Sequence, residues 1–385
     1  MNWSTWIEVD LDALRHNFLQ IRSRTAARIC LVVKADAYGH GAPMVVAHLY
    51  KHGAQSFAVS DLEEATAIRS ASQAPLLLLS PPLPDQASLV VKHRLMATVT
   101  SLPLVEALAR HAWASRTRLQ IHLKVDTGLG RLGVAPRDAL SLALKIVSLR
   151  SLKLAGVFTH FSAGSNRRQT EKQLQELLNL KQAFTEAGLT GLTWHAANSA
   201  AFCQGPHTHL DMVRIGTMLY GQGECGRHMT LRDTWAFYAR LIAVKQVQAG
   251  SRIGYGGTYR ARRRMTVGVI PVGYSDGFHL EPLSTPAVQL RRAVSRLVGL
   301  GSCSAFADGS PLPVVGKVGM NLTCLDLSAV PEAEPGLVVR LAARRTTISR
   351  RIPKVYLEQG RVVAVWCGGQ SIQPQAFDRL NCHSI

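Results

Sequence analysis

The segment that decides the fold is Leu31-Val32-Val33-Lys34-Ala35-Asp36-Ala37-Tyr38-Gly39-His40-Gly41. Its apolar start is typical of a strand buried in a parallel sheet, and the glycines that follow favour a tight turn into a helix. Lys34 therefore lies where a strand ends. In a cleft at that point, partial loss of water lowers the pKa of a lysine and frees its amine to react with a carbonyl. A lysine that snorkels to the surface is the alternative, and the motifs around it decide against that alternative.

Strand-like and helix-like stretches alternate through the first two-thirds of the chain. Helical stretches such as Asp61–Ser70 and Glu171–Ala187 separate the strand-like runs, and Asp61 with Glu64 forms a candidate capping box. This alternation predicts an α/β fold, a (β/α)8 TIM barrel of parallel strands each followed by a helix. The strand-like runs are Ile29–Val33, Ser56–Ser60, Leu76–Leu79, Met96–Val99, Leu119–Val125, Leu154–Phe158, Leu192–His195 and Leu210–Arg214.

From about residue 235 the pattern changes to strand-like segments separated by turns rich in Gly, Pro and Ser. We expect residues 1–234 to form the barrel domain and residues 235–385 to form a mainly β domain. The opening segment Trp6–Val9 is also strand-like and is a candidate to join the sheet of the second domain. The strand-like segments after 235 are Tyr238–Val247, Met265–Val272, Val288–Val298, Val314–Leu327, Leu337–Arg340 and Val362–Trp366.

The composition argues against several classes of protein. No apolar run reaches the roughly 18 residues that span a bilayer, and Met1–Thr5 lacks the basic segment of a signal peptide. The 7 cysteines are scattered without a CxxC pair, which argues against a disulfide framework or a zinc site and favours a reducing compartment. We therefore expect a cytoplasmic protein with no metal site and no membrane partner.

The formal net charge is high, at +19. The basic clusters are short, such as Arg262–Arg264 and Arg291–Arg292, and no aromatic residues are interleaved with them as in a single-strand binder. No nucleic-acid-reading motif is present. We expect a general bias toward Lys and Arg, and no nucleic-acid partner.

Polar motifs follow the ends of five of the predicted strands. In a barrel, such strand ends meet at the face that carries the chemistry. Ser199 offers a hydroxyl, and Gly216 with Thr217 offers backbone N–H groups in a glycine turn before a helix, a suitable cradle for an anion. A reactive lysine together with a phosphate cradle indicates pyridoxal phosphate. Besides Lys34, the motifs are Lys124–Gly133, Thr159–Ser162, His195–Ser199 and Arg214–Gly221.

These motifs carry a resemblance that covers nearly the whole chain. In order, the segments VVKADAYGHG (32–41), KVDTGLGRLG (124–133), FTHFS (158–162), HAANSA (195–200) and RIGTMLYG (214–221) resemble those of alanine racemases, the fold-type III pyridoxal-phosphate enzymes. In the second domain RIGYGGTY (252–259), VGYSDG (272–277) and GKVGMN (316–321) also match. The combination is far more specific than any single match.

The resemblance implies a role for each matching residue. Lys34 would hold pyridoxal phosphate through its amine and act as one catalytic acid/base, and Tyr255 of a second subunit would act as the other. Tyr38, Ser199, Gly216 and Thr217 would bind the phosphate. The remaining residues would surround the cofactor and substrate: His160 and Asn198 at the cofactor, Arg131 at its phenolic oxygen and at the substrate, Arg214 at its ring nitrogen, His195 behind Arg214, Lys124 beside Arg131 (free or as a carbamate), Met320 at the substrate carboxylate through its backbone, and Asn321 at the substrate.

Arg214 bears most on the type of reaction. A guanidinium donates hydrogen bonds and keeps its protons, so it leaves a ring nitrogen neutral. That favours racemisation over transamination, and it disfavours a decarboxylase of the same fold. No metal-binding cluster supports an aldolase. A salt bridge is the ordinary alternative for an arginine at this position.

Two departures from the family pattern affect the specificity. Asn321 stands where alanine racemases usually carry Asp, and serine racemases that resemble them carry Asn there. Arg350 stands where many members carry a Tyr that lines the entrance, and we expect Arg350→Ala to weaken cofactor retention.

The function implied is therefore interconversion of L- and D-alanine, supplying D-alanine for peptidoglycan, by a homodimer with shared active sites. A racemase for serine or for a broader range of amino acids is one alternative. A non-enzymatic pyridoxal-phosphate carrier is another, although such carriers lack the second domain.

Overall fold

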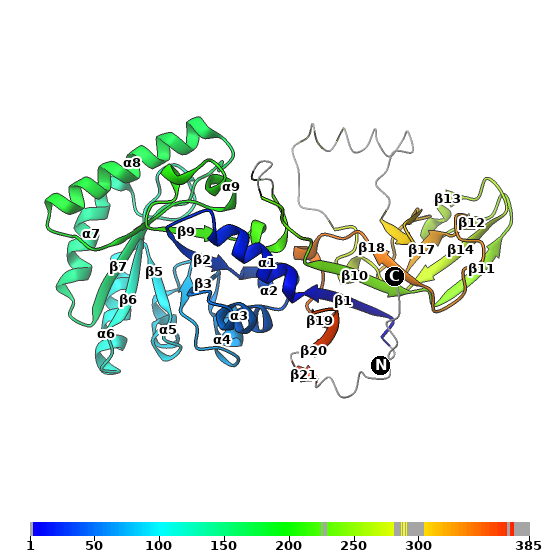
Figure 1. The fold of residues 1–385 in the computed structure, drawn as a ribbon, viewed down its shortest axis with the longest axis horizontal. Coiled ribbons are helices and arrows are strands. Elements are labelled where there is room, and N and C mark those ends of the chain that lie inside the picture. Colours follow the sequence, from blue (N-terminus) through cyan, green and yellow to red (C-terminus); the bar gives the residue numbers. More distant parts are fainter. Residues whose placement is uncertain are drawn as a thin grey trace. The chain divides into compact units, whose positions relative to one another are not determined.

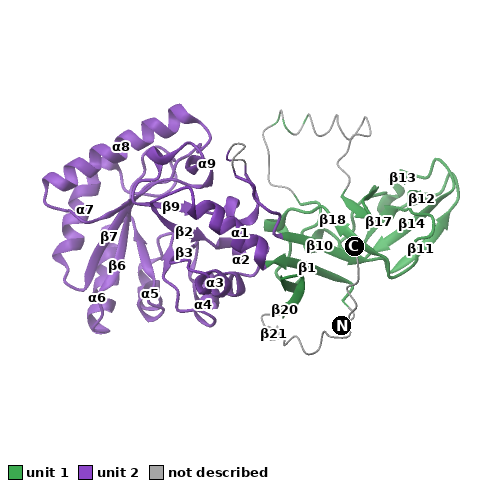
Figure 2. Cartoon of the chain, viewed as in Figure 1, with its two compact units in different colours: residues 1–10, 235–385 green, residues 11–234 purple. Residues whose placement is uncertain are grey.

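The computed structural model describes residues 3–223, 225, 229–280, 286, 288, 290, 304–367 and 370–372. The chain splits into two compact units, which Figure 2 colours separately. Unit 1 contains Met1–Asp10 and Trp235–Ile385, and unit 2 contains Leu11–Thr234. Each unit has its own buried apolar core.

Unit 2 is a nearly closed barrel of parallel strands surrounded by helices (Figure 1). Seven neighbouring pairs are parallel ladders, with β9 next to β2. The remaining pair, β8 and β9, meets through hydrogen bonds from Asp211 N to Trp194 O and from Arg214 N to Ala197 O, both of 3.0 Å. The predicted barrel is confirmed. Its strands are β2 (Arg28–Val32), β3 (Ser56–Val59), β4 (Leu76–Leu78), β5 (Met96–Val99), β6 (Leu119–Lys124), β7 (Leu152–Phe158), β8 (Thr193–His195) and β9 (Met212–Ile215).

The helices of unit 2 follow local sequence signals. α1 buries Leu11, Leu14, Phe18 and Ile21, a stripe at helical spacing that faces the core. Proline opens α7 at its first position, where its missing N–H costs nothing. The helices are α1 (Leu11–Arg22), α2 (Lys34–Gly39), α3 (Ala42–Lys51), α4 (Leu62–Arg69), α5 (Ala87–Lys92), α6 (Leu102–Ala114), α7 (Pro136–Ser148), α8 (Arg167–Glu186) and α9 (Ser199–Phe202), with 3-10 helices η1 (Pro84–Gln86), η2 (Pro206–Thr208) and η3 (Thr217–Tyr220).

Only one of the two hydrogen bonds of the predicted capping box of α4 is present. Asp61 Oδ1 accepts a 2.9 Å hydrogen bond from Glu64 N and so caps the helix. The carboxylate of Glu64 turns instead toward Ser60, whose hydroxyl it accepts at 3.1 Å, and toward the backbone of Asp36. Tertiary contacts therefore take this side chain away from its local role.

Unit 1 is mainly β, as predicted. Its large sheet has the order β16-β15-β18-β10-β1-β19-β20-β21, and a smaller sheet has the order β11-β14-β17. β1 (Thr5–Asp10) lies between β10, to which it is antiparallel, and β19, to which it is parallel. The other strands are β10 (Trp235–Arg240), β11 (Ala243–Val247), β12 (Arg252–Ile253), β13 (Tyr259–Arg260), β14 (Met265–Ile270), β15 (Ala305–Ala307), β16 (Ser310–Leu312), β17 (Thr323–Asp326), β18 (Val338–Leu341), β19 (Lys354–Glu358), β20 (Arg361–Cys367) and β21 (Gln370–Ile372), with η4 (Tyr255–Gly257), η5 (Tyr274–Asp276) and η6 (Arg345–Thr347).

Some strand predictions for unit 1 need correction. The run Tyr238–Val247 is two strands, β10 and β11, which belong to different sheets. In Val314–Leu327 only Thr323–Asp326 is a strand, because positive-φ Gly316 interrupts the extended backbone. Sequence periodicity missed β19. The predicted run Val288–Val298 lies almost wholly outside the described residues.

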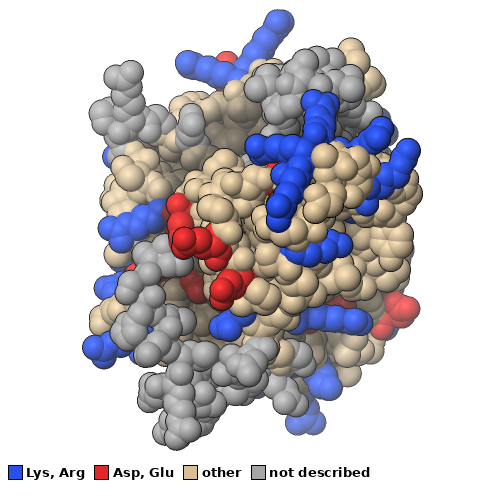
Figure 3. Space-filling view, turned by 90° about the vertical axis from the view of Figure 1, so that its right-hand side faces the viewer, with Lys and Arg blue, Asp and Glu red and all other residues tan. Residues whose placement is uncertain are grey.

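A basic face occurs on unit 1. No Asp or Glu lies between Asp233 and Asp276 in the sequence. Strand β11 of the smaller sheet and the β12–β13 hairpin, which belong to this stretch, carry several exposed cations. Figure 3 views the molecule from the side of unit 1, and several Lys and Arg side chains project from the surface seen there. The high net charge is thus concentrated in part on one region of the molecule. The exposed cations of this stretch include Lys245, Arg252, Arg260, Arg262, Arg263 and Arg264.

Among the described residues, two cysteines form a disulfide, which runs against the expectation of a reducing compartment. Cys203 follows α9, Cys225 follows η3, and the two are bonded with their Cα atoms 5.0 Å apart. Twenty-two positions separate them in sequence, so no short cysteine motif marks the pair. Among the described residues, Cys30, Cys324 and Cys367 are free. No helix in the described part of the chain is long and apolar enough to cross a membrane.

Candidate active site

A cavity of about 560 Å³ opens in unit 2 at the carboxyl ends of the barrel strands. This is the face where barrels place their chemistry. Strand ends and the turns after them supply most of its walls. Ten of the site residues predicted from the sequence line it: Lys34, Tyr38, Lys124, Arg131, His160, Asn198, Ser199, Arg214, Gly216 and Thr217.

Lys34 enters this cavity from an unusual turn. The next four residues, Ala35–Tyr38, all have φ between 53° and 55°, the left-handed region. Each such residue costs about 1–2 kcal/mol unless other contacts hold it. Here Glu64 Oε1 accepts from Asp36 N at 3.1 Å, and Asp36 Oδ1 accepts from Ala42 N at 2.9 Å. The turn is therefore fixed by two carboxylates.

The amine of Lys34 is tuned by its surroundings. Burial lowers the pKa of Lys34, and the nearby charge of Arg131 lowers it further, while Glu64 opposes both. A larger share of the amine is then neutral than in an exposed lysine. A neutral amine is the form that attacks carbonyl carbon.

Polar groups suited to an anion gather where the turns after β8 and β9 meet, and we call this cluster the anion cradle. Ser199 Oγ accepts a 3.0 Å hydrogen bond from Gly216 N. A β-carbon on residue 216 would come within 2.5 Å of the Tyr38 hydroxyl, so only glycine allows this approach. Hydroxyl and backbone donors from Ser199, Gly216, Thr217 and Tyr38 thus gather at one corner of the cavity, as a phosphorylated cofactor requires.

Arg214 lies at the floor of the cavity and is only 3% exposed. Its guanidinium donates to Thr159 O at 2.8 Å, to Ala196 O at 2.9 Å and to His195 Nδ1 at 2.8 Å. Burial lowers the pKa of Arg214 to about 10, which still leaves it protonated at neutral pH. These partners are neutral, no salt bridge to Arg214 occurs among the described residues, and Arg214 lines the cavity.

The neighbouring His160 is held neutral. Burial lowers the pKa of His160 to about 3, and the charges of Arg214 and Lys124 add to that effect. Its Nδ1 lies 3.3 Å from a guanidinium nitrogen of Arg214, which donates to it. An imidazole that stays neutral can lie flat against an aromatic ring without adding charge.

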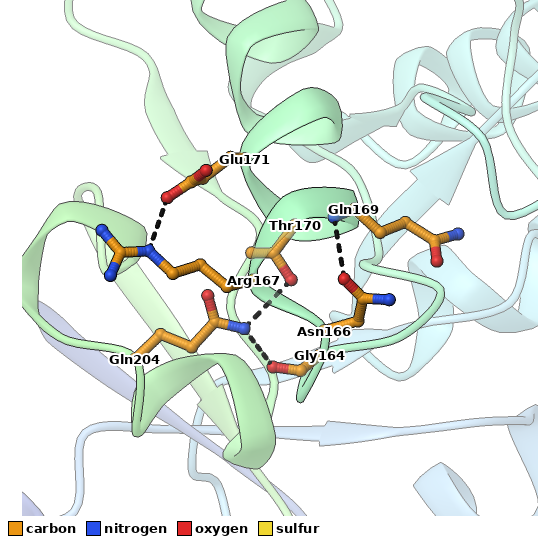
Figure 4. Close-up of polar contacts among 7 residues, drawn as sticks. All are labelled: Gly164, Asn166, Arg167, Gln169, Thr170, Glu171 and Gln204. Carbon is orange, nitrogen blue, oxygen red and sulfur yellow. Dashed lines mark hydrogen bonds and ion pairs between the residues drawn. The ribbon is translucent and has the colours of Figure 1, made fainter.

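Hydrogen bonds from outside the loop hold the segment between β7 and α8, which carries His160. Gln173 Oε1 accepts from the backbone and the hydroxyl of Ser162, both at 2.9 Å. Further along, Gln204 Nε2 donates to Gly164 O at 2.6 Å, and Asn166 caps α8 (Figure 4). The loop therefore has little freedom to carry His160 away from the cavity.

Of the other predicted site residues, His195 lies behind Arg214 in unit 2, and Tyr255, Met320 and Asn321 lie together in unit 1. Tyr255 is 77% exposed, an unusual display for a large aromatic side chain. A β-carbon on Gly319 would come within 3.4 Å of the Tyr255 ring, so this ring lies beside the segment that carries Met320. Asn321 Nδ2 donates to Ser275 Oγ at 2.9 Å, and that hydroxyl donates to Met320 O at 2.7 Å. Three sequence segments thus form one exposed polar cluster.

Comparison with known proteins identifies the family. Residues 9–223 match the family model of the alanine racemase N-terminal domain, and residues 234–356 match that of the C-terminal domain. The chain belongs to the alanine racemase family. This bears out the resemblance on which the sequence-based predictions depend.

Relatives match over nearly the full length of the family fold. The alanine racemase of Desulfosudis oleivorans is 35% identical, with 96% of this chain and 98% of the relative covered. A solved alanine racemase from Clostridium difficile 630 superposes with a TM-score of 0.85 at 26% identity, covering 95% of this chain and 99% of the other. The alanine racemase of Bacillus anthracis, solved with bound L-Ala-P, gives 0.81 at 27% identity and covers 98% and 99%.

Asp126, rather than Lys124, holds the loop that carries Arg131. Asp126 Oδ1 accepts backbone N–H groups of Gly128, Leu129 and Gly130 at 2.8–3.1 Å, and Oδ2 accepts that of Arg131 at 3.2 Å. Within the described residues no hydrogen bond joins Lys124 to Arg131. The carboxylate of Asp126 therefore shapes this loop, a role that the sequence analysis did not assign.

Lys124 is the second tuned amine of the family site. Burial lowers the pKa of Lys124 to about 8, and the charges of Arg214 and Arg131 contribute in the same direction. Its Nζ lies 5.5 Å from the centre of the Phe158 ring. The sequence analysis also missed Glu64, because its contact with Asp36 spans 28 positions and leaves no local pattern.

Proposed function

We propose that this chain is a pyridoxal-phosphate-dependent racemase that interconverts L- and D-alanine. The observation that carries the proposal is the cavity of unit 2, where the amine of Lys34 and the guanidinium of Arg214, held by neutral partners, line the same space as the anion cradle. Full-length similarity to curated alanine racemases supports the same reaction.

The residues of the cavity fit this cofactor chemically. Gly216 approaches Tyr38 so closely that only a glycine leaves the cradle open to a phosphate. Lys34 supplies an amine of lowered pKa for the aldehyde. Bound pyridoxal phosphate withdraws electrons from the α-carbon of an amino acid and so makes its hydrogen acidic.

The protein groups then move the proton. Racemisation needs one base on each face of the α-carbon, and we assign Lys34 Nζ to one face and Tyr255 Oη to the other. Arg214 would donate a hydrogen bond to the ring nitrogen of the cofactor and keep its own protons. A ring nitrogen held in this way would stay neutral, which would limit electron withdrawal and favour return of the proton over side reactions.

The exposed position of Tyr255 supports a homodimer with shared active sites. A phenol that is 77% exposed can reach a site on another molecule, and we assign it to the site of a second copy. A non-enzymatic pyridoxal-phosphate carrier needs no second catalytic base, so the exposed phenol of Tyr255 disfavours that alternative.

We place the protein in the cytoplasm, as a source of D-alanine for peptidoglycan. Disulfides are rare in a reducing compartment, so this location predicts that the Cys203–Cys225 pair is reduced in the cell. Thiol labelling of the protein in intact cells and in fractions tests the location separately from the activity.

A specific observation favours serine as a second substrate. Asn321 presents an amide, which can donate a hydrogen bond as well as accept one, beside the backbone of Met320. An ionised carboxylate at this position would only accept. We therefore retain a serine or broader amino-acid racemase as the alternative function.

Incubation with L-alanine and with L-serine in deuterated water tests the function. Incorporation of deuterium at the α-carbon together with inversion is the expected result. Lys34→Ala should abolish both, whereas Tyr255→Phe should abolish inversion and leave exchange on one face. Release of carbon dioxide or of an aldehyde, or exchange with complete retention in the unmodified protein, contradicts the proposal.

A further inference from the structure

A second buried histidine stands behind the Arg214–His195 pair. His122 on β6 is 4% exposed, and its Nδ1 lies 2.9 Å from Nε2 of His195. The two rings meet edge to face, with centroids 5.1 Å apart and an interplanar angle of 70°. Arg214, His195 and His122 therefore form a continuous hydrogen-bonded chain inside unit 2.

The donors and acceptors of this chain have a single consistent direction. A guanidinium has only N–H donors, so Nδ1 of His195 must accept the 2.8 Å hydrogen bond from Arg214. The proton of neutral His195 is then on Nε2, which donates to Nδ1 of His122. His122 in turn carries its proton on Nε2.

Both imidazoles are neutral at physiological pH. Burial lowers the pKa of His122 to about 4, and the charge of Arg214 adds to this. Burial and Arg214 also lower the pKa of His195 well below its ordinary value. The guanidinium of Arg214 is therefore hydrogen-bonded to a neutral imidazole, His195, which is itself hydrogen-bonded to a second neutral imidazole, His122.

The barrel wall is shaped around His122. The pairing of β6 with β7 shifts its register between Ile121 and His122, an irregularity that re-aims side chains. His122 pairs with Gly156, where a β-carbon would come within 2.8 Å of His122 Nδ1 and 2.5 Å of Thr193 O. The glycine therefore leaves the room that the imidazole occupies.

We propose that His122 is a positioning residue, which fixes the tautomer of His195 and so holds Arg214 toward the cavity without adding negative charge. This inference rests on the proposed function, in which Arg214 donates to the cofactor ring nitrogen. His122 itself touches neither substrate nor cofactor.

His122 must be neutral to hold His195 and Arg214 in this way. A carboxylate in place of His122 would stabilise a doubly protonated His195. An imidazolium has two donors and no acceptor, so it could not accept from Arg214, and two cations would face each other. His122→Asp is therefore expected to displace Arg214, whereas His122→Asn keeps a neutral acceptor oxygen on the same carbon that bears Nδ1.

The first test uses cofactor-free protein and nitrogen-15 NMR of labelled histidine. In the unmodified protein we expect His195 with a proton on Nε2 only, and no titration of His195 or His122 between pH 5.5 and 8.5, roughly the range in which an ordinary histidine titrates. His122→Leu should alter the His195 signals, and His122→Asn should restore them. A proton on Nδ1 of His195 in the unmodified protein overturns the proposal, and this measurement needs no variant to fold.

The second test measures kcat for alanine with the loaded enzyme. His122→Leu leaves a buried donor unpaired, and we expect kcat to fall on the order of tenfold, with His122→Asn close to the unmodified enzyme. His48→Leu removes another buried histidine, on α3, and serves as the matched control with kcat unchanged. Equal kcat for His122→Leu and the unmodified enzyme, or equal losses for the Leu and Asn variants, overturns the proposal.

Failure of the proposed function gives a different pattern. In that case the unmodified protein binds no pyridoxal phosphate or racemises no amino acid, whatever the NMR of the cofactor-free protein reports. The tautomer of His195 and its dependence on His122 are then still measured independently.

Discussion

Gly216 lies against the hydroxyl of Tyr38, so that a β-carbon at residue 216 would come within 2.5 Å of that oxygen. The contact joins the turn after β9 to the left-handed turn after β2. Tyr38 is also stacked on Tyr220, with ring centroids 4.8 Å apart, so it cannot retreat freely. A single glycine therefore sets the shape of the anion cradle.

Gly216→Ala is expected to weaken binding of pyridoxal phosphate by about tenfold or more, because a buried clash typically costs ~1–3 kcal/mol. Equilibrium dialysis measures the dissociation constant. In a Tyr38→Phe background the offending oxygen is gone, so the same substitution should cost less. Equal losses in the two backgrounds would show that the Tyr38 hydroxyl is not the obstacle.

Asp126→Asn should loosen the loop that carries Arg131. Partial burial raises the pKa of Asp126, but four backbone N–H groups outweigh it and lower the pKa overall. A lowered folded-state pKa means that the carboxylate stabilises the loop above the unfolded pKa, and that this is lost as pH falls through the folded-state pKa. The protection factor of the Arg131 amide, which is the intrinsic exchange rate at each pH divided by the observed rate, should therefore be high at neutral pH and fall below pH ~4. The exposed Asp138→Asn is the control, and an Arg131 amide unchanged by Asp126→Asn would refute this role.

Lys124 should react with acylating reagents at lower pH than ordinary lysines. Its pKa of about 8, lowered first by burial, leaves a large neutral fraction of the amine at pH 8. The exposed Lys145 on α7 is the comparison within the same chain. Mass spectrometry of peptides after brief labelling measures both rates. Equal dependence of the two lysines on pH would contradict the lowered pKa, and the same neutral amine is the form that could take up carbon dioxide as a carbamate.

Cys203→Ser should lower the free energy of unfolding. Closing a loop of 22 positions by a disulfide is worth about 3 kcal/mol in the chain-entropy description. Chemical denaturation with and without a reducing agent measures the difference. The free thiol of Cys324 provides the control, since Cys324→Ser should respond to reduction as the unmodified protein does. Identical denaturation of oxidised and reduced protein would exclude the bond as a stabilising element.

Asn321→Asp should shift the substrate preference from serine toward alanine. The amide of Asn321 donates to Ser275 Oγ, which in turn donates to Met320 O. A carboxylate would compete for the single proton of Ser275 and remove a donor from the cluster. We expect the ratio of kcat/KM for serine to that for alanine to fall about fivefold or more. Asn321→Ala, which also lacks a donor but adds no charge, separates the two effects, and an unchanged ratio in both variants would rule out Asn321 as a selector.

The sequence by itself determined the strands of the barrel and the residues at their carboxyl ends. Apolar runs and helical spacing are local, so eight parallel strands and the position of Lys34 and Arg214 followed from them and from the family motifs. The family resemblance likewise implied roles for Tyr255, Met320 and Asn321, and the fold gathers them in unit 1.

Only the tertiary structure decided how these groups are held. The left-handed turn after Lys34 depends on Glu64, a contact that spans 28 positions. His122 reaches His195 across 73 positions, and Cys203 reaches Cys225 from another segment. Local propensity disfavours a left-handed turn and does not predict which distant residues pair. The free energy that stabilises both comes from contacts that exist only when the barrel has closed.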